Sequence, residues 1–159
     1  MLYKNKTCTN LSKIIVNKKA YYNYFIEEVF QSGIVLKGWE IKSIRSGNIN
    51  ISASYIINNL NEIYLCNSVI QPLCTISNYS FFNSTRKRKL LLHKREINFL
   101  SIKIKNIGYT VIPLSFFWKK SWCKLEIGLA KGKNICDKRT KIKNCNWSKE
   151  KSRILKQNK

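Results

Sequence analysis

The densest group of residues able to bind a ligand is a basic run at residues 86–95, RKRKLLLHKR. It holds six Lys or Arg and no acidic residue, and three of the six are arginine in a chain whose 30 basic residues include only six arginines. Clustered guanidinium and ammonium groups suit phosphate oxygens, which arginine binds through paired hydrogen bonds. The run therefore indicates contact with a nucleic-acid backbone. The alternative is a solvated basic face without a ligand.

Aromatic side chains next to basic residues are a second candidate. Tyr21, Tyr22 and Tyr24 follow Lys18 and Lys19, and exposed aromatic rings beside cations can stack on unpaired bases. Neighbouring residues of a strand point to opposite faces, so either Tyr24 or the residue after it belongs to the core instead.

Residues able to catalyse a reaction are scarce. The chain has one histidine, His93, eight scattered acids and no Gly-x-x-x-x-Gly-Lys phosphate loop. Glu27 and Glu28 are adjacent on an expected strand, so they would face opposite ways. The six cysteines lack Cys-x-x-Cys spacing, which argues against zinc. We therefore expect no enzyme and no cofactor, with the cysteines as reduced thiols.

The net charge of +22 on 159 residues implies a polyanionic partner: RNA, DNA or an anionic membrane. Part of the lysine excess, together with abundant Ile and Asn, is what an AT-rich genome produces, so the placement of the charge carries more information than its total. No segment approaches the roughly 20 apolar residues of a membrane span, and residues 1–20 lack a signal-peptide core. We expect a cytoplasmic protein without a membrane partner.

The pattern of apolar residues divides the chain into three parts. Residues 1–19 read as a basic arm, 20–130 as the folded body and 131–159 as a basic tail. Within the body, period-two alternation and turn residues predict strands, with one short helix that Gly47 ends. The expected elements are a strand at 24–30 with a turn at Ser32-Gly33, a strand from 34, a helix at 39–45, strands at 49–57 and 63–70, and a mobile loop at 75–84.

A seven-residue repeat of Leu90, Ile97 and Ile104 predicts a helix that ends at Gly108. The basic run would then lie at the start of this helix, where free backbone amides favour phosphate. Residues 109–117 and 122–129 read as two strands of a hairpin. The body is thus expected to be mainly β, with five or six strands and two or three helices.

The tail holds eleven Lys or Arg and two acids. Such a segment cannot bury enough surface to offset its ordering entropy, so we expect it to be disordered when free. Trp147 and Ile154 lie seven residues apart, with Lys151 between them and Leu155 adjacent. One face would be apolar if the tail formed a helix on a partner. The alternative is that Trp147 packs back on the body.

Short motifs recur along most of the chain. In order they are NKKA at 17–20, YFIEE at 24–28, GWEIKS at 38–43, RSG at 45–47, SY at 54–55, TR at 85–86, RKLLL at 88–92, RE at 95–96, GYTV at 108–111, WK at 118–119, WCK at 122–124, GLAKGK at 128–133 and DKR at 137–139. This series spans roughly residues 14 to 156, almost without gaps, and resembles the SsrA-binding proteins, or small protein B family.

The resemblance implies a small antiparallel barrel of the oligonucleotide-binding type (OB-like) with flanking helices. Members of the family bind the tRNA-like domain of transfer-messenger RNA and escort it, charged with alanine, into the empty A site of a stalled ribosome. The body stands in for the missing anticodon arm, while the tail forms a helix in the vacant messenger channel of the small subunit. The partners implied are this RNA, the ribosome and elongation factor Tu, for a monomeric protein.

Site residues follow from the basic clusters and from the matched positions. The predicted RNA-binding residues are Asn17, Lys18, Lys19, Tyr24, Arg45, Arg86, Arg88, Lys89 and Leu91. The predicted decoding-centre and channel residues are Lys131, Gly132, Lys133, Asp137, Lys138, Arg139, Trp147, Lys151, Arg153, Ile154 and Leu155. The chain departs from the family pattern at Tyr22, Gln31, Asn83-Ser84, Asn134 and Cys136. Gln31 stands where a glutamate is common, which weakens the case for that one contact.

Three other functions fit parts of the sequence. Another barrel protein, ribosomal or an unspecific single-strand binder, would explain charge and fold but would leave the Trp147 and Ile154 face unused; competition at raised salt separates the two. An RNA-modifying enzyme would show turnover on a tRNA-like substrate. A membrane-surface protein would need a long amphipathic helix rich in apolar residues, which the sequence lacks.

Overall fold

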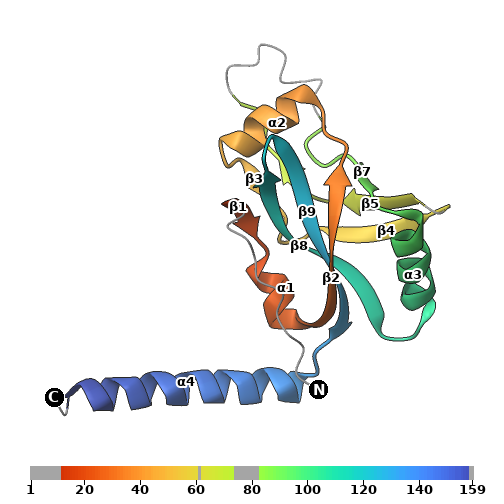
Figure 1. The fold of residues 1–159 in the computed structure, drawn as a ribbon. Helices are drawn as coiled ribbons and strands as arrows, with labels where there is room; N and C mark the ends of the chain where they lie inside the picture. The colour runs from red at the N-terminus through yellow and green to blue at the C-terminus, as the bar shows by residue number, and fades with distance from the viewer. Residues whose placement is uncertain (1–11, 61, 74–82, 158–159) are drawn as a thin grey trace.

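The computed structural model describes residues 12–60, 62–73 and 83–157. A seven-stranded antiparallel sheet, in the order β1-β8-β9-β2-β7-β5-β4, dominates it, with a small two-stranded sheet of β3 and β6 (Figure 1). The strands are β1 (Ser12–Val16), β2 (Tyr24–Ile34), β3 (Ile49–Asn50), β4 (Tyr55–Asn59), β5 (Glu62–Cys66), β6 (Val69–Ile70), β7 (Arg88–Leu91), β8 (Tyr109–Lys119) and β9 (Trp122–Gly132). The helices are α1 (Lys18–Asn23), α2 (Gly38–Arg45), α3 (Lys94–Lys105) and α4 (Ile135–Gln157).

The mainly β class with a few helices agrees with the prediction, although the described residues hold more strands than the five or six expected. The helix expected at 39–45 is present as α2, and Gly47 follows it with φ 79°. The expected hairpin is present as β8 and β9, joined by a tight turn in which Lys120 has φ 56°. Closure of the sheet into a barrel is not shown.

Three long strands, β8, β9 and β2, form the centre of the sheet. The predicted break at Ser32-Gly33 is wrong, because β2 runs through both residues and stays paired with β9 as far as Lys124. The buried Ser32 hydroxyl donates to the Leu125 carbonyl oxygen at 3.0 Å, so this polar residue has a partner inside the sheet.

The sheet is packed on both faces. On one face, Leu125, Ile127 and Leu129 alternate along β9 into the main core, which Leu100 of α3 also enters. On the other face, α1 covers a smaller cluster of Ala20, Ile112, Leu114 and Ala130. The two clusters together fix the positions of β8 and β9 within the body.

The helix predicted between Leu90 and Gly108 is present as α3, but its first turn is wrong. Residues 88–91 form β7, in which Leu90 lies opposite Ile34 of β2 and Ile63 of β5, and α3 begins only at Lys94. The Glu96 carboxylate accepts a 2.9 Å hydrogen bond from the His93 amide and fixes that start. Long-range strand pairing therefore overrides the seven-residue repeat at its start, and the basic run is divided: Arg88 and Lys89 lie on β7, while Lys94 and Arg95 lie in the first turn of α3.

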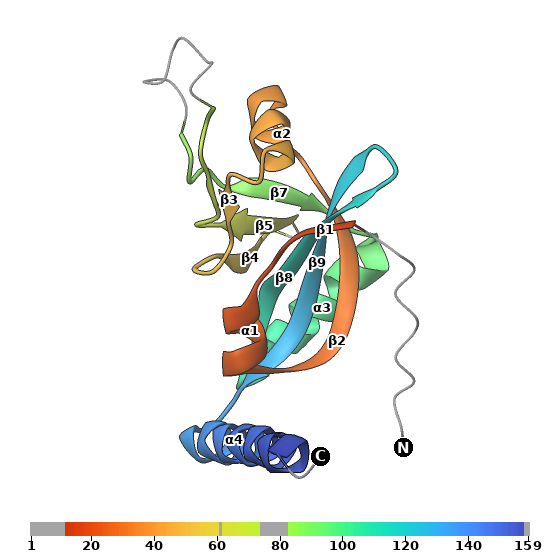
Figure 2. The same ribbon diagram turned by 90° about the vertical axis from the view of Figure 1, so that its left-hand side faces the viewer.

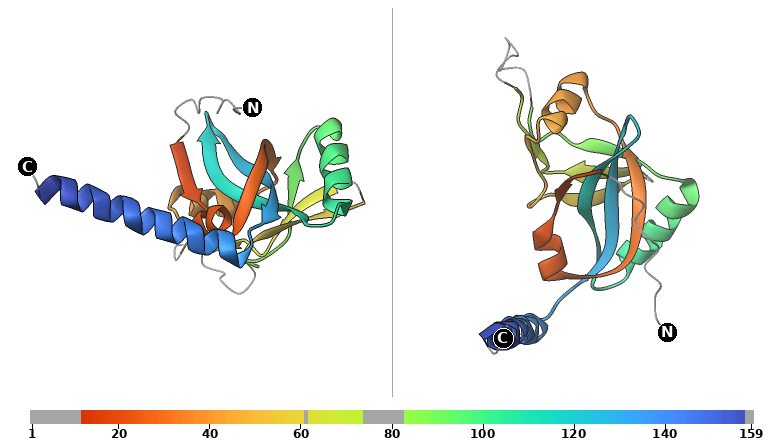
Figure 3. Two further views of the ribbon diagram at one scale, coloured as in Figure 1. Left: turned by 90° about the horizontal axis from the view of Figure 1, so that it is seen from below. Right: turned by 60° about the vertical axis from the view of Figure 1, so that its left-hand side comes forward.

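Both ends of the body differ from the expectation. Residues 12–19 of the predicted arm form β1, which pairs with β8, and the start of α1; residues 1–11 lie outside the described residues. The expected tail disorder is not confirmed, because residues 135–157 form α4, which extends away from the sheet (Figures 2 and 3). Most of the loop expected at 75–84 falls outside the described residues. Among the helices that are described, none has the length and apolar character needed to cross a membrane.

Candidate nucleic-acid interface

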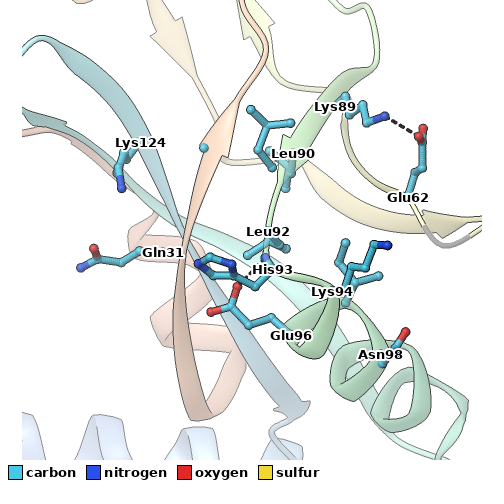
Figure 4. Close-up of a pocket in the computed structure, with 13 residues that line it drawn as sticks. Gln31, Glu62, Lys89, Leu90, Leu92, His93, Lys94, Glu96, Asn98 and Lys124 are labelled. Carbon is cyan, nitrogen blue, oxygen red and sulfur yellow. Dashed lines mark hydrogen bonds and ion pairs between the residues drawn. The ribbon is translucent and has the colours of Figure 1, made fainter.

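A cavity of about 680 Å³ opens where β2, β7, β9 and the start of α3 meet. Gln31 comes from β2, Lys89 from β7 and Lys124 from β9, while His93 and Lys94 lie at the start of α3 (Figure 4). The lining combines three lysines with neutral hydrogen-bonding groups and apolar side chains, and it also holds the carboxylates of Glu62 and Glu96. Such a mixture can receive a nucleotide, with the lysines facing its phosphates.

Strand geometry sets the cavity floor. Leu91 lies opposite Gly33 in the β2–β7 pair, and its side chain remains 53% exposed. A Cβ atom at Gly33 would approach Leu91 Cβ to 3.2 Å, so only glycine leaves this leucine its present place. Lys89, two residues earlier on β7, points to the same side and forms an ion pair with Glu62. Two of the predicted RNA-binding residues, Lys89 and Leu91, are therefore together at one exposed site.

A further residue at this site was missed from the sequence. Lys124 lies opposite Gly33 on β9 and lines the cavity. Trp122, two residues earlier on β9, pairs with Lys119 of β8 outside the cavity lining, and its 75% exposed ring is available for stacking on a base. The strand expected at 122–129 did include Lys124, but only its register against β2 brings this lysine to the cavity.

The burial of Arg88 contradicts its predicted contact with RNA. Its side chain is fully buried, because the alternation along β7 turns it inward while Lys89 and Leu91 turn outward. The guanidinium donates hydrogen bonds of 2.7–3.1 Å to the Glu40 carboxylate, the Ser68 hydroxyl and the backbone carbonyl oxygens of Ser68, Ser84 and Arg86. A surface phosphate cannot reach it in this arrangement, so Arg88 supports the interface from beneath.

Glu40 of α2 is the buried anion that holds this arginine. Arg86 also pairs with it, through Nε at 2.8 Å and through Nη2, and is itself only 21% exposed. Burial alone raises the pKa of the Glu40 carboxyl, but hydrogen bonds from Arg86 and the Lys37 amide, with the charges of Arg88 and Arg86, outweigh burial and lower it. The carboxylate is therefore ionised and ties α2 to the segment that leads into β7.

The predicted residues around α1 lie at the opposite end of β2 from the cavity. Asn17 is buried and caps α1: its Oδ1 accepts from the Ala20 amide at 3.1 Å, while Nδ2 donates to two carbonyl oxygens of Ile51 and Pro113. This side chain therefore builds the fold and is not available to RNA. Lys18 and Lys19 are exposed, whereas Tyr24 is half-buried against the small core cluster under α1.

Arg45 lies at the end of α2, the helix whose Glu40 pairs with Arg86 and Arg88. Its guanidinium carbon is 5.7 Å from the centre of the Trp118 ring, a cation–π contact at the surface. The remaining donors of this exposed arginine face solvent, so it can still meet a phosphate.

The predicted tail residues lie at the end of β9 and along α4. Lys131 and Gly132 end β9, Lys133 leads into α4, and Asp137 lies in the first turn of α4, followed by Lys138 and Arg139. Trp147 is 69% exposed, so it does not pack back on the body, and further along α4 the same is true of Lys151, Arg153, Ile154 and Leu155. The apolar face predicted for a partner is present and uncovered among the described residues.

Four of the six cysteines lie among the described residues. Cys66, Cys123, Cys136 and Cys145 are free thiols, and burial raises the pKa of Cys123 to about 11, so this thiol stays protonated at neutral pH. Within the segments that the structure describes, no three His, Cys, Asp or Glu side chains gather closely enough to hold a metal ion.

Comparison with known proteins identifies the family of this chain. The family model described as SmpB protein matches residues 14–157. A protein named SsrA-binding protein from Buchnera aphidicola subsp. Acyrthosiphon pisum (strain Tuc7) is 65% identical over 159 residues, which is all of this chain and 98% of the relative. The SsrA-binding protein of the subspecies Schizaphis graminum (strain Sg) is 63% identical over 157 residues, covering 98% of this chain and 96% of the relative.

A solved structure, "tmRNA-SmpB: a journey to the center of the bacterial ribosome", contains a chain of similar fold. The TM-score is 0.64 with 36% sequence identity, over 80% of this chain and 87% of that one. Fold, sequence and the matched residues agree, and they lead to one identification: this chain belongs to the SmpB family of SsrA-binding proteins.

Proposed function

We propose that this protein binds transfer-messenger RNA and delivers it to stalled ribosomes, where the incomplete peptide is tagged. The observation that carries the proposal is the separation of two basic surfaces: a shaped cavity on the sheet, and a helical tail with uncovered side chains along its length. The cavity can hold a structured RNA while the helical tail binds elsewhere. Membership of the SmpB family supports this division.

The cavity is proposed to receive the tRNA-like domain. Lys124, Lys89 and Lys94 would meet backbone phosphates, while Leu91 would pack against sugar or base surfaces. The exposed ring of Trp122, outside the cavity, would add a stacking surface. The exposed residues Lys18, Lys19 and Arg45 would add long-range attraction. Arg88 and Asn17 are proposed to position this interface from inside the body, and Arg86 does so through Glu40.

The tail is proposed to follow the empty messenger channel of the small subunit from the A site. Its exposed cations suit an RNA-lined passage, and Trp147, Ile154 and Leu155 provide apolar contacts at its far end. The residues from Lys131 to Arg139 would lie near the decoding centre. The body would stand in for an anticodon arm within a delivery complex that includes elongation factor Tu.

We further propose that the protein is a monomer, that it acts in the cytoplasm by binding alone and without a cofactor, and that its sheet is an OB-like barrel. Residues of β4 lie against β8 as well as pairing with β5, a contact of the kind that brings the two edges of a sheet together.

An unspecific single-strand binder is the alternative, since it would share the charge and the fold. The two differ in what the tail does. Cutting the chain after Ala130 should leave binding of transfer-messenger RNA intact and abolish tagging in a purified translation system. If tagging survives the truncation, the proposed role of the tail is wrong.

A further inference from the structure

Helix α1 and the beginning of the tail are joined by four contacts within a short stretch. The Lys133 amide donates to the Asn23 carbonyl oxygen at 3.0 Å, and Lys133 Nζ donates to the Tyr21 carbonyl oxygen at 2.8 Å. Lys138 Nζ donates to Asn23 Oδ1 at 3.1 Å and lies 5.9 Å from the centre of the Tyr22 ring. The last residues of α1 therefore hold two successive lysines of the tail.

Side-chain exposure marks the same two lysines. Among the tail residues up to Leu155 whose exposure is described, Lys133 and Lys138 are partly covered and all the others are exposed. Beyond Lys138, α4 continues away from the body (Figure 3). The base of the tail is thus in contact with the body, while the greater length of α4 is not.

The position of Lys138 within α4 indicates that its favourable contacts come from outside the helix. Its amide donates to the Asn134 carbonyl oxygen, which places it in the first turn of the helix. A cation near a helix N-terminus is opposed by the helix dipole, so this lysine does not stabilise α4 by itself. The amide oxygen of Asn23 and the face of the Tyr22 ring supply the favourable interactions that the helix lacks.

We propose that Tyr22 and Asn23 form a clamp that fixes the direction in which the tail leaves the body, with Lys138 as its positioning residue. The partner of Lys138 in the free protein is then the body itself rather than RNA. The angle at which α4 leaves the body matters because the helix is long: its 23 residues span about 34 Å. A rotation of about 10° at its base moves its end by about 6 Å, roughly the 5.4 Å pitch of one helical turn.

The clamp is a property of the free chain, and only its consequence for ribosome rescue rests on the proposed function. Hydrogen–deuterium exchange on the full-length protein without RNA therefore tests it separately. The variants are N23A, which removes the amide, K138M, which keeps the length and helix propensity of the side chain, and the double variant. K149M is the matched control, because Lys149 is exposed on the same helix.

Each single variant should raise the exchange rates of amides 138–140, the first amides of α4 with acceptors within the helix, by about three- to tenfold, the range expected for one exposed hydrogen bond or cation–π contact. The double variant should exchange no faster than the faster single variant, because both changes break the same contact. K149M should leave these amides unchanged, and K138R should retain protection.

Unchanged exchange in N23A, or rates that multiply in the double variant, would overturn the clamp. Amides of β8 and β9 in each variant report whether the body remains folded. If they also exchange faster in N23A, Tyr22→Leu replaces it, because this variant keeps an apolar side chain but lacks the aromatic face. Protection at amides 138–140 equal to that of the unaltered protein would again reject the proposal.

Discussion

Replacing Arg88 with methionine tests whether this arginine supports the fold or contacts RNA. The substitution keeps an unbranched side chain of similar bulk, so it removes the charge without opening a large cavity. It leaves the fully buried Glu40 carboxylate with Arg86 as its remaining arginine partner, and it removes the guanidinium donor from the carbonyl oxygens of Ser68 and Ser84.

The expected loss is large for one residue. Removing one partner of a buried ion pair costs about 3–5 kcal/mol in free energy of unfolding, out of a total of about 5–15 kcal/mol for a typical domain. For a chain of this length that corresponds to a fall of roughly 6–20 °C in melting temperature. Thermal and urea unfolding followed by far-UV circular dichroism, in the absence of RNA, would measure it.

Arg95→Met provides the control, because Arg95 is exposed in the first turn of α3. A surface substitution of this kind should change the stability by about 0.5 kcal/mol or less. If R88M proves as stable as R95M, the buried ion cluster does not stabilise the fold and the reasoning about Arg88 fails.

Three further outcomes follow from the same structure. Lys124→Met should weaken binding of transfer-messenger RNA and reduce the slope of log K against log salt by about one, as filter binding would measure; an unchanged slope would remove Lys124 from the phosphate contacts. The folded-state pKa of Glu40 lies below its ordinary value of 4.5, so the stability that its charge contributes is present above pH 4.5 and is lost as the pH falls through the folded value. The wild type should therefore have a higher urea midpoint than Glu40→Gln at pH 7, and the two midpoints should approach each other near pH 3. Gly128→Ala should cost about 1–3 kcal/mol of stability, because its Cβ would lie 2.9 Å from Leu114 Cδ1. Gly38→Ala is the control, because a Cβ at Gly38 would meet open space. Equal unfolding midpoints for the two variants would contradict this packing.

Local sequence patterns predicted the elements that depend on local interactions. The turn between β8 and β9 and the glycine after α2 both lie where the sequence indicates them, because turn residues and helix ends are set by neighbouring residues. Membership of the family was also available from the ordered motifs.

Burial inside the sheet could not be predicted in the same way. The repeat of Leu90, Ile97 and Ile104 is compatible with a helix, and only the pairing of β7 with β2 and β5 makes residues 88–91 a strand. That pairing also turns Arg88 inward and Lys89 outward, which contradicts the predicted RNA contact of Arg88 alone. Lys124 was missed for a related reason, since its place beside Gln31 depends on the register of β9 against β2.

The central claim is that the sheet face around Leu91 and Lys124 recognises the shape of one structured RNA, beyond general attraction between charges. Competition binding of the full-length protein, with transfer-messenger RNA against an unstructured RNA of equal length, tests this most directly when repeated from about 50 to 200 mM salt. We expect the preference for transfer-messenger RNA to persist or grow as salt rises, because unspecific binding declines faster. Equal affinities for both RNAs across the whole range would contradict it.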